Sequence, residues 1–85
     1  MSKVRVIRAD GTREELEDRE PTLEELQEVV GGYIEIVRSY EDLDEVLVVN
    51  EEGRLKKLPV NELASSVAKR LIVGDVVVLP ESYIQ

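Results

Sequence analysis

The chain has 85 residues, a length typical of one small domain, which we expect to span residues 1–85. It contains no cysteine and no histidine, so disulfides, thiolate metal sites and imidazole-based catalysis are excluded. Nineteen acidic and eleven basic residues give a net charge of −8, which disfavours direct binding to nucleic acid or anionic membranes. The first residues lack a secretory segment, and we expect a cytoplasmic protein. Abundant Glu, Arg and Val are also typical of a heat-adapted source.

The first predicted elements form a hairpin. Apolar and charged residues alternate over residues 3–8, with Val4 and Val6 on the core side, which indicates a strand. Asp10-Gly11 predicts a tight two-residue turn in which both residues have positive φ. The return segment, residues 12–17, is so polar that we expect it at the edge of a sheet.

A short helix follows over residues 23–30. Thr22 and Glu25 have the spacing of a capping box, and Gly31-Gly32 is typical of a helix end. Leu23, Leu26 and Val30 fall on one side of this helix, so we expect them to form its buried stripe.

The remaining segments predict three further strands, a second helix and a last strand. The strands are residues 33–38, the apolar segment 46–49 in a central position, and 54–56 after a type I turn at 50–53. Asn61 would cap a helix over 62–70 with an apolar face of Leu63, Ala64, Val67 and Ala68. The last strand covers 76–79. The order ββαβββαβ predicts an α+β fold with two short helices on a small mixed, mostly antiparallel sheet.

Catalytic chemistry has little support in this sequence. The serines have no histidine to activate them, and 85 residues can hardly enclose a dry cleft around a pair of carboxylates. The acids of residues 41–45 are suitable ligands for a divalent cation, but their spacing matches no calcium loop. We therefore expect a binding protein with no enzymatic activity, no cofactor and no metal.

Basic residues offer one candidate binding site. Arginine suits bidentate recognition of phosphate, and an exposed tyrosine can stack on a base. The predicted ligand-binding residues are Arg5, Arg8, Tyr33, Asn50, Arg54, Lys57 and Asn61. Alternatively, these bases simply pair with carboxylates on neighbouring strands. A small anionic ligand could also lie between subunits of a homo-oligomer, because so small a domain has little concave surface of its own.

Acidic residues offer a second candidate, a surface that binds a host protein. Residues 13–28 contain eight acids, and such a face could imitate the phosphates of a nucleic acid and inhibit a nuclease or polymerase. The residues concerned are Glu14, Glu17, Asp18, Glu24 and Glu28. A third hypothesis is a structural or regulatory adaptor with no special ligand.

Four short motifs carry a family resemblance: Gly-Gly-Tyr-Ile-Glu at 31–35, Asn-Glu-Glu-Gly at 50–53, Pro-Val-Asn at 59–61 and Val-Gly-Asp at 73–75. In this order the chain resembles a family of small uncharacterised domains encoded largely by bacteriophages, prophages and mobile elements. The resemblance implies an accessory protein of a phage-like genome, acting in the host cytoplasm, and no catalytic residues. Capture of a nucleotide-like signal of host immunity is the function we expect first for such a protein.

Overall fold

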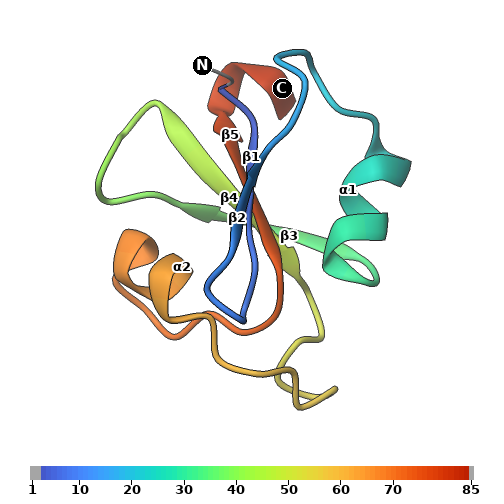
Figure 1. The fold of residues 1–85 in the computed structure, drawn as a ribbon, viewed down its shortest axis with the longest axis vertical. Coiled ribbons are helices and arrows are strands. Elements are labelled where there is room, and N and C mark those ends of the chain that lie inside the picture. Colours follow the sequence, from blue (N-terminus) through green and yellow to red (C-terminus); the bar gives the residue numbers. More distant parts are fainter. Residues whose placement is uncertain (1–2, 85) are drawn as a thin grey trace.

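The computed structural model describes residues 3–84, which form an α+β fold as predicted (Figure 1). A single sheet has the strand order β2-β1-β5-β4-β3, and every neighbouring pair is antiparallel. The sheet is therefore wholly antiparallel rather than mixed. The elements in chain order are β1 (Arg5–Ile7), β2 (Arg13–Glu15), α1 (Leu23–Val30), β3 (Ile34–Arg38), β4 (Glu45–Asn50), α2 (Glu62–Ala68), β5 (Val76–Pro80) and the 3-10 helix η1 (Glu81–Ile84).

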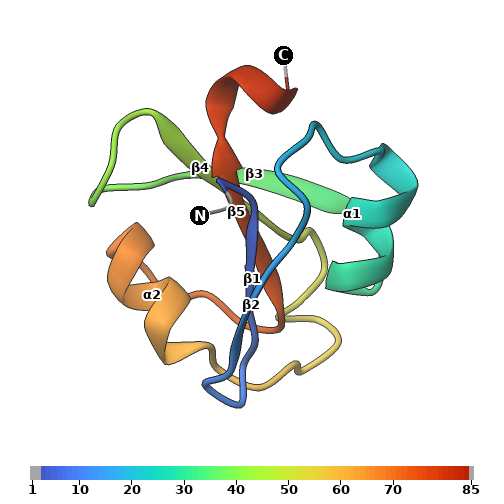
Figure 2. The same ribbon diagram turned by 45° about the horizontal axis from the view of Figure 1, so that its top comes forward.

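The two helices cover opposite faces of the sheet, so the core has two layers (Figures 1 and 2). Successive residues of a strand point to opposite faces, and β4 supplies both layers, as predicted for a central apolar strand. Leu47 and Val49 pack on the α2 side, whereas Val46 and Val48 pack on the α1 side. None of the helices within residues 3–84 is long and apolar enough to cross a membrane.

The strand predicted over residues 54–56 is not formed. This segment is a series of turns, in which Lys56 N donates to Glu52 O at 3.0 Å and Leu58 N donates to Gly53 O at 3.1 Å. The reason is topological: β4 already has β3 on one side and β5 on the other, so a strand returning from it has no free edge to pair with. The type I turn before it is present, with Gly53 N donating to Asn50 O.

The β1–β2 turn also differs from the two-residue turn that Asp10-Gly11 predicted. Arg8 N donates to Thr12 O, and Gly11 N donates to Arg8 O, so the loop has three residues. Only Gly11 has a positive φ, 93°. The Asp10 side chain accepts bonds from the backbone N and the hydroxyl of Thr12, which holds Asp10 in an ordinary conformation.

Both helices have the predicted start signals. Thr22 and Glu25 form the capping box, Gly31 ends α1 with a φ of 82°, and Asn61 caps α2. Two predicted core leucines are exposed, however: Leu23 by 57% and Leu63 by 41%. Helical periodicity identifies the inward side of a helix, but not how far along the helix the sheet extends. Helix α2 also ends at Ala68 rather than near residue 70, because Lys69 adopts a left-handed conformation.

Candidate functional site: a hollow with two arginines

The two predicted phosphate ligands on the first hairpin are held by carboxylates. Arg5 donates two hydrogen bonds to Glu45, at 2.8 and 3.2 Å, and this contact raises the pKa of the guanidinium. Arg8 lies between Glu14 and Asp75, at 3.0 and 3.2 Å, and its hydrogen bond to Glu14 raises its pKa in the same way. The charge of each arginine is therefore already compensated within the chain. This agrees with the alternative hypothesis that these bases pair with carboxylates of the same chain.

The two predicted asparagines are buried and bonded within the chain. Asn50 donates to Val30 O at 2.9 Å and accepts from Glu52 N, which joins the end of α1 to the turn after β4. Asn61 is 1% exposed. Its oxygen accepts from Ala64 N, and its nitrogen donates to Ile7 O and Gly74 O, both at 2.9 Å. These contacts fix segments of the backbone around the hollow at Arg54.

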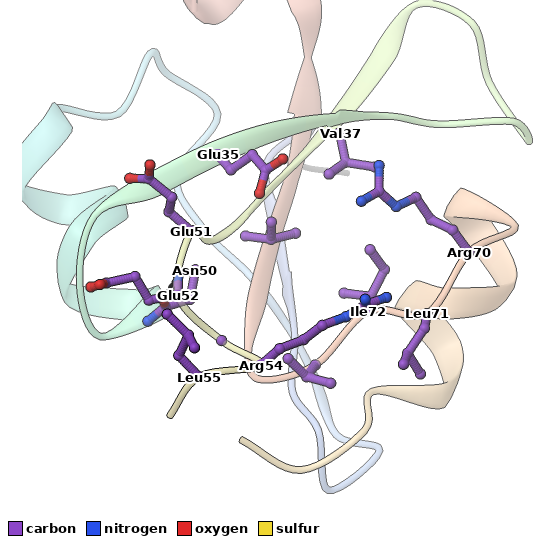
Figure 3. Close-up of a pocket in the computed structure, with 13 residues that line it drawn as sticks. Glu35, Val37, Asn50, Glu51, Glu52, Arg54, Leu55, Arg70, Leu71 and Ile72 are labelled. Carbon is purple, nitrogen blue, oxygen red and sulfur yellow. Dashed lines mark hydrogen bonds between the residues drawn. The ribbon is translucent and has the colours of Figure 1, made fainter. Parts of the chain in front are cut away.

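Arg54 lies in a different setting, at a hollow of about 190 Å³ on the α2 side of the sheet (Figure 3). The hollow lies between β3, the turns at 50–55 and the segment that follows α2. Val37, Val49 and Ile72, all buried, give it an apolar interior, and the more exposed Leu55 and Leu71 stand at its rim. It is lined by Glu35, Val37, Val49, Asn50, Glu51, Glu52, Gly53, Arg54, Leu55, Arg70, Leu71, Ile72 and Val73.

The segment after α2 is held in place by a short antiparallel contact. Val60 and Val73 form a bridge, Asn61 N donates to Ile72 O at 2.9 Å, and Gly74 N donates to Pro59 O at 2.7 Å. The Ser65 hydroxyl accepts from Ile72 N at 2.9 Å, which ties the same segment to α2. This anchoring places Arg70 at the mouth of the hollow.

The opposite wall depends on a close approach of two backbone segments. A Cβ atom on Gly53 would lie 2.7 Å from Val73 Cγ2 and 3.4 Å from Asn50 O. Only glycine therefore lets the turn at 50–53 pack against Val73 without a shift of one of them. This contact positions Arg54, the next residue, beside the segment that carries Arg70.

The hollow carries two arginines without carboxylate partners. Within residues 3–84, the side chains of Arg54, Arg70 and the distant Arg13 on β2 make no ion pair or hydrogen bond, whereas Arg5, Arg8, Arg19 and Arg38 lie within 4.0 Å of a carboxylate. Figure 3 shows both guanidinium groups extending into the hollow, with the Glu35 carboxylate on β3 facing the same space. Glu51 and Glu52 extend away from the arginines. The hollow thus presents two uncompensated cations beside an apolar surface.

Two further predicted ligand-binding residues do not line this hollow. Tyr33 is 68% exposed and lines a second, open depression with Lys56 and acids of α1. Lys57 is exposed at a left-handed position in the turn. Of the predicted ligand-binding residues, the hollow therefore contains Arg54 and Asn50.

The five acids of the alternative site do not form an unbroken stripe. Glu14 pairs with Arg8, Glu17 lies 3.5 Å from Arg19, and Asp18 accepts a hydrogen bond from the Tyr83 hydroxyl. Glu24 and Glu28, on α1, make no ion pair within residues 3–84. Bases therefore interrupt this surface at Arg8 and Arg19.

Sequence reasoning did not assign Arg70 and Glu35 to the site. Arg70 was expected to be the last residue of a helix over 62–70, but that helix ends at Ala68. Its nearness to Arg54 depends on the Val60–Val73 bridge, for which the sequence gives no local signal. The alternation of side chains along β3 predicts that Glu35 and Val37 lie on the same face of the sheet. It does not predict that two arginines from other segments lie opposite them.

No group of three or more acids within residues 3–84 is arranged to hold a metal ion.

A family model described as "Domain of unknown function (DUF3846)" matches residues 2–82, nearly the whole chain. No curated protein and no solved structure matches this chain.

Proposed function

We propose that this chain, which belongs to the DUF3846 family of domains of unknown function, is a non-enzymatic protein that binds a small anion in the Arg54–Arg70 hollow. The observation that carries the proposal is the pair of arginines without carboxylate partners in a chain with a net charge of −8. Although acids are abundant in this chain, neither of these two neighbouring arginines pairs with one. This favours an external anion as their partner. Arginine binds phosphate and carboxylate through two parallel hydrogen bonds.

The surroundings favour a ligand with a flat or apolar part beside its charge. Ile72 and Val49 offer an apolar surface within the hollow, and Leu55 at the rim is 81% exposed. Glu35 can accept a hydrogen bond from a hydroxyl or amino group on the same molecule. A nucleotide combines a phosphate, a planar base and such donors, so we infer a nucleotide-like ligand.

The biological setting forms part of the same proposal. We propose a phage-type accessory protein of the host cytoplasm that captures a nucleotide-like signal of host immunity. The resemblance of the four short motifs to those of phage-encoded domains supports this setting, and the position of the two arginines supports the ligand class. Inhibition of a host enzyme through the acidic face, and the adaptor role, stay alternatives, and the bases that interrupt that face make it the weaker of the two surfaces.

Calorimetric titration tests the proposal. We expect heat of binding from at least one member of a panel of nucleoside monophosphates and cyclic mono- and dinucleotides, and none from the uncharged nucleosides. Arg54→Gln and Arg70→Gln should each weaken binding by about 10-fold or more, because each removes a charge-assisted hydrogen bond. Arg13→Gln is the matched control: it removes the same charge from the exposed strand β2, away from the hollow, and should leave affinity unchanged.

Two results would contradict this function. One is the absence of binding to every anion of the panel. The other is an equal affinity in the Arg54→Gln, Arg70→Gln and Arg13→Gln variants, which would mean that any binding reflects overall charge or another surface.

A further inference from the structure

The outer edge of β3 has unpaired backbone groups. In the β3–β4 ladder, Glu51 N donates to Tyr33 O, and Ser39 N donates to Glu45 O. Hydrogen bonding alternates along an antiparallel strand, so the N–H and C=O groups of Ile34, Ile36 and Arg38 point away from β4. β3 is the last strand of the sheet, and no backbone group of these three residues has a partner on that side within residues 3–84.

The two edges of the sheet differ in how they are protected. β2 has only three residues, all charged and exposed, which is a common protection against pairing with another chain. β3 has five residues with no net charge, and Ile36 in its centre is 44% exposed. Two exposed tyrosines, Tyr33 and Tyr40, stand near its ends. Aromatic residues are enriched in protein interfaces.

We propose that β3 pairs antiparallel with β3 of a second copy of this chain, about a two-fold axis at Ile36. The outward backbone groups allow only registers in which even-numbered residues bond to even-numbered residues. The register centred on Ile36 pairs all five residues of each strand and sets Ile36 opposite Ile36 of the second copy. A shift that centres on Glu35 sets two carboxylates directly opposite each other, which is destabilising.

This pairing is favoured by charge as well as by backbone geometry. Two copies with a net charge of −8 repel each other, and β3 offers an approach along a segment with no net charge. In the proposed register Tyr33 of one copy lies opposite Ser39 of the other, next to Tyr40. The ten strands would form one continuous sheet.

The dimer would join the two anion-binding hollows. A two-fold axis perpendicular to the sheet keeps the α2 sides of both copies on the same face. It places Glu35 opposite Val37 of the second copy, and both residues line a hollow. A single hollow of about 190 Å³ is smaller than the roughly 300–1,000 Å³ of most ligand pockets, and two adjoining hollows reach that range. This part of the inference rests on the proposed function, whereas the pairing itself does not.

Measurement of molecular mass without ligand tests the pairing, so it can fail or succeed independently of anion binding. Sedimentation of the wild-type chain across a concentration series should give twice the 9.6 kDa of one chain. Ile36→Lys sets two like charges opposite each other and should give a monomer. Leu63→Lys is the matched control, because Leu63 is 41% exposed on α2 and its replacement should leave the dimer intact. Circular dichroism establishes that each variant is folded.

A wild-type monomer at every concentration, or an Ile36→Lys variant that stays dimeric, would overturn the proposal. If Ile36→Lys does not fold, hydrogen exchange of the wild-type chain decides. Slow exchange at the amides of Ile36 and Arg38 supports the pairing, because these N–H groups have no partner in a single copy, and fast exchange refutes it.

Discussion

Asn61→Asp is the substitution that best tests how the hollow is built. At an ordinary helix start, Asp and Asn are equally good caps, and their exchange changes stability little. Asn61 does more than cap α2, because its nitrogen also donates to Ile7 O and Gly74 O in a site that is 1% exposed. Aspartate keeps the bond from Ala64 N but turns a carboxylate oxygen toward two buried carbonyl groups.

The expected cost is the loss of both donated bonds together with unsatisfied carbonyl groups. Each buried carbonyl group left without its donor costs about 1–3 kcal/mol, so the two together should cost about 2–6 kcal/mol. Urea unfolding followed by circular dichroism measures it: with a slope of roughly 1 kcal/mol per molar, the midpoint should fall by about 2 M or more. Thr22→Asn, an exchange of two caps at the exposed start of α1, is the control and should shift the midpoint little.

The pH dependence of the Asn61→Asp variant gives a second check. Burial and the facing carbonyl groups should raise the pKa of the new carboxyl in the folded state above its unfolded value. The folded state then binds more protons in the interval between the two values, so stability rises as pH falls through the folded pKa. An Asn61→Asp variant as stable as the wild type at neutral pH would refute the claim that Asn61 joins α2 to β1 and the 72–74 segment.

Two further predictions concern the α1 cap and the wall of the hollow. The Arg19 hydrogen bond lowers the pKa of Glu25 to about 2. The stabilisation from Glu25 is therefore present above its ordinary pKa of 4.5 and is lost as pH falls toward 2; an NMR titration of Arg19→Gln should show a higher pKa, and an unchanged value would refute the assignment. Gly53→Ala places a methyl group 2.7 Å from Val73 Cγ2, so we expect a stability loss of about 1–3 kcal/mol and weaker anion binding. Adding Val73→Ala should restore both in urea and calorimetric measurements, and a double variant no better than Gly53→Ala would contradict this account.

The parts of the fold that the sequence predicted well depend on contacts between near neighbours. The α1 capping box joins residues three apart, and the Gly31 end signal lies directly after the helix. The apolar segment of β4 predicted a strand covered on both faces, because successive apolar residues point to opposite faces and both faces must then be buried. In each case the physical cause lies within a few residues of the feature.

The failures arise where a distant segment decides the outcome. Residues 54–56 have a strand-like pattern, but the free edge they need is already occupied by β3 or β5. Asn61 was recognisable as a cap through its bond with Ala64, whereas its bonds to Ile7, 54 residues away, and to Gly74 are tertiary. The candidate site follows the same rule: Arg54 could be singled out as a base, but Arg70 reaches the same hollow only through the bridge between Val60 and Val73.

The arrangement of arginines gives the strongest physical reason to look for function at this hollow. Arg5 and Arg8 show that the fold readily brings carboxylates to its bases, since both receive partners from distant segments of the chain. Glu35, Glu51 and Glu52 all line the hollow, yet none lies within 4.0 Å of the Arg54 or Arg70 side chain. Exposed arginines gain little stability from a carboxylate partner, so the reason to look here is that both side chains extend into one hollow with an apolar interior. Without a carboxylate partner, both guanidinium groups are available to an anion from outside, as the proposed function requires.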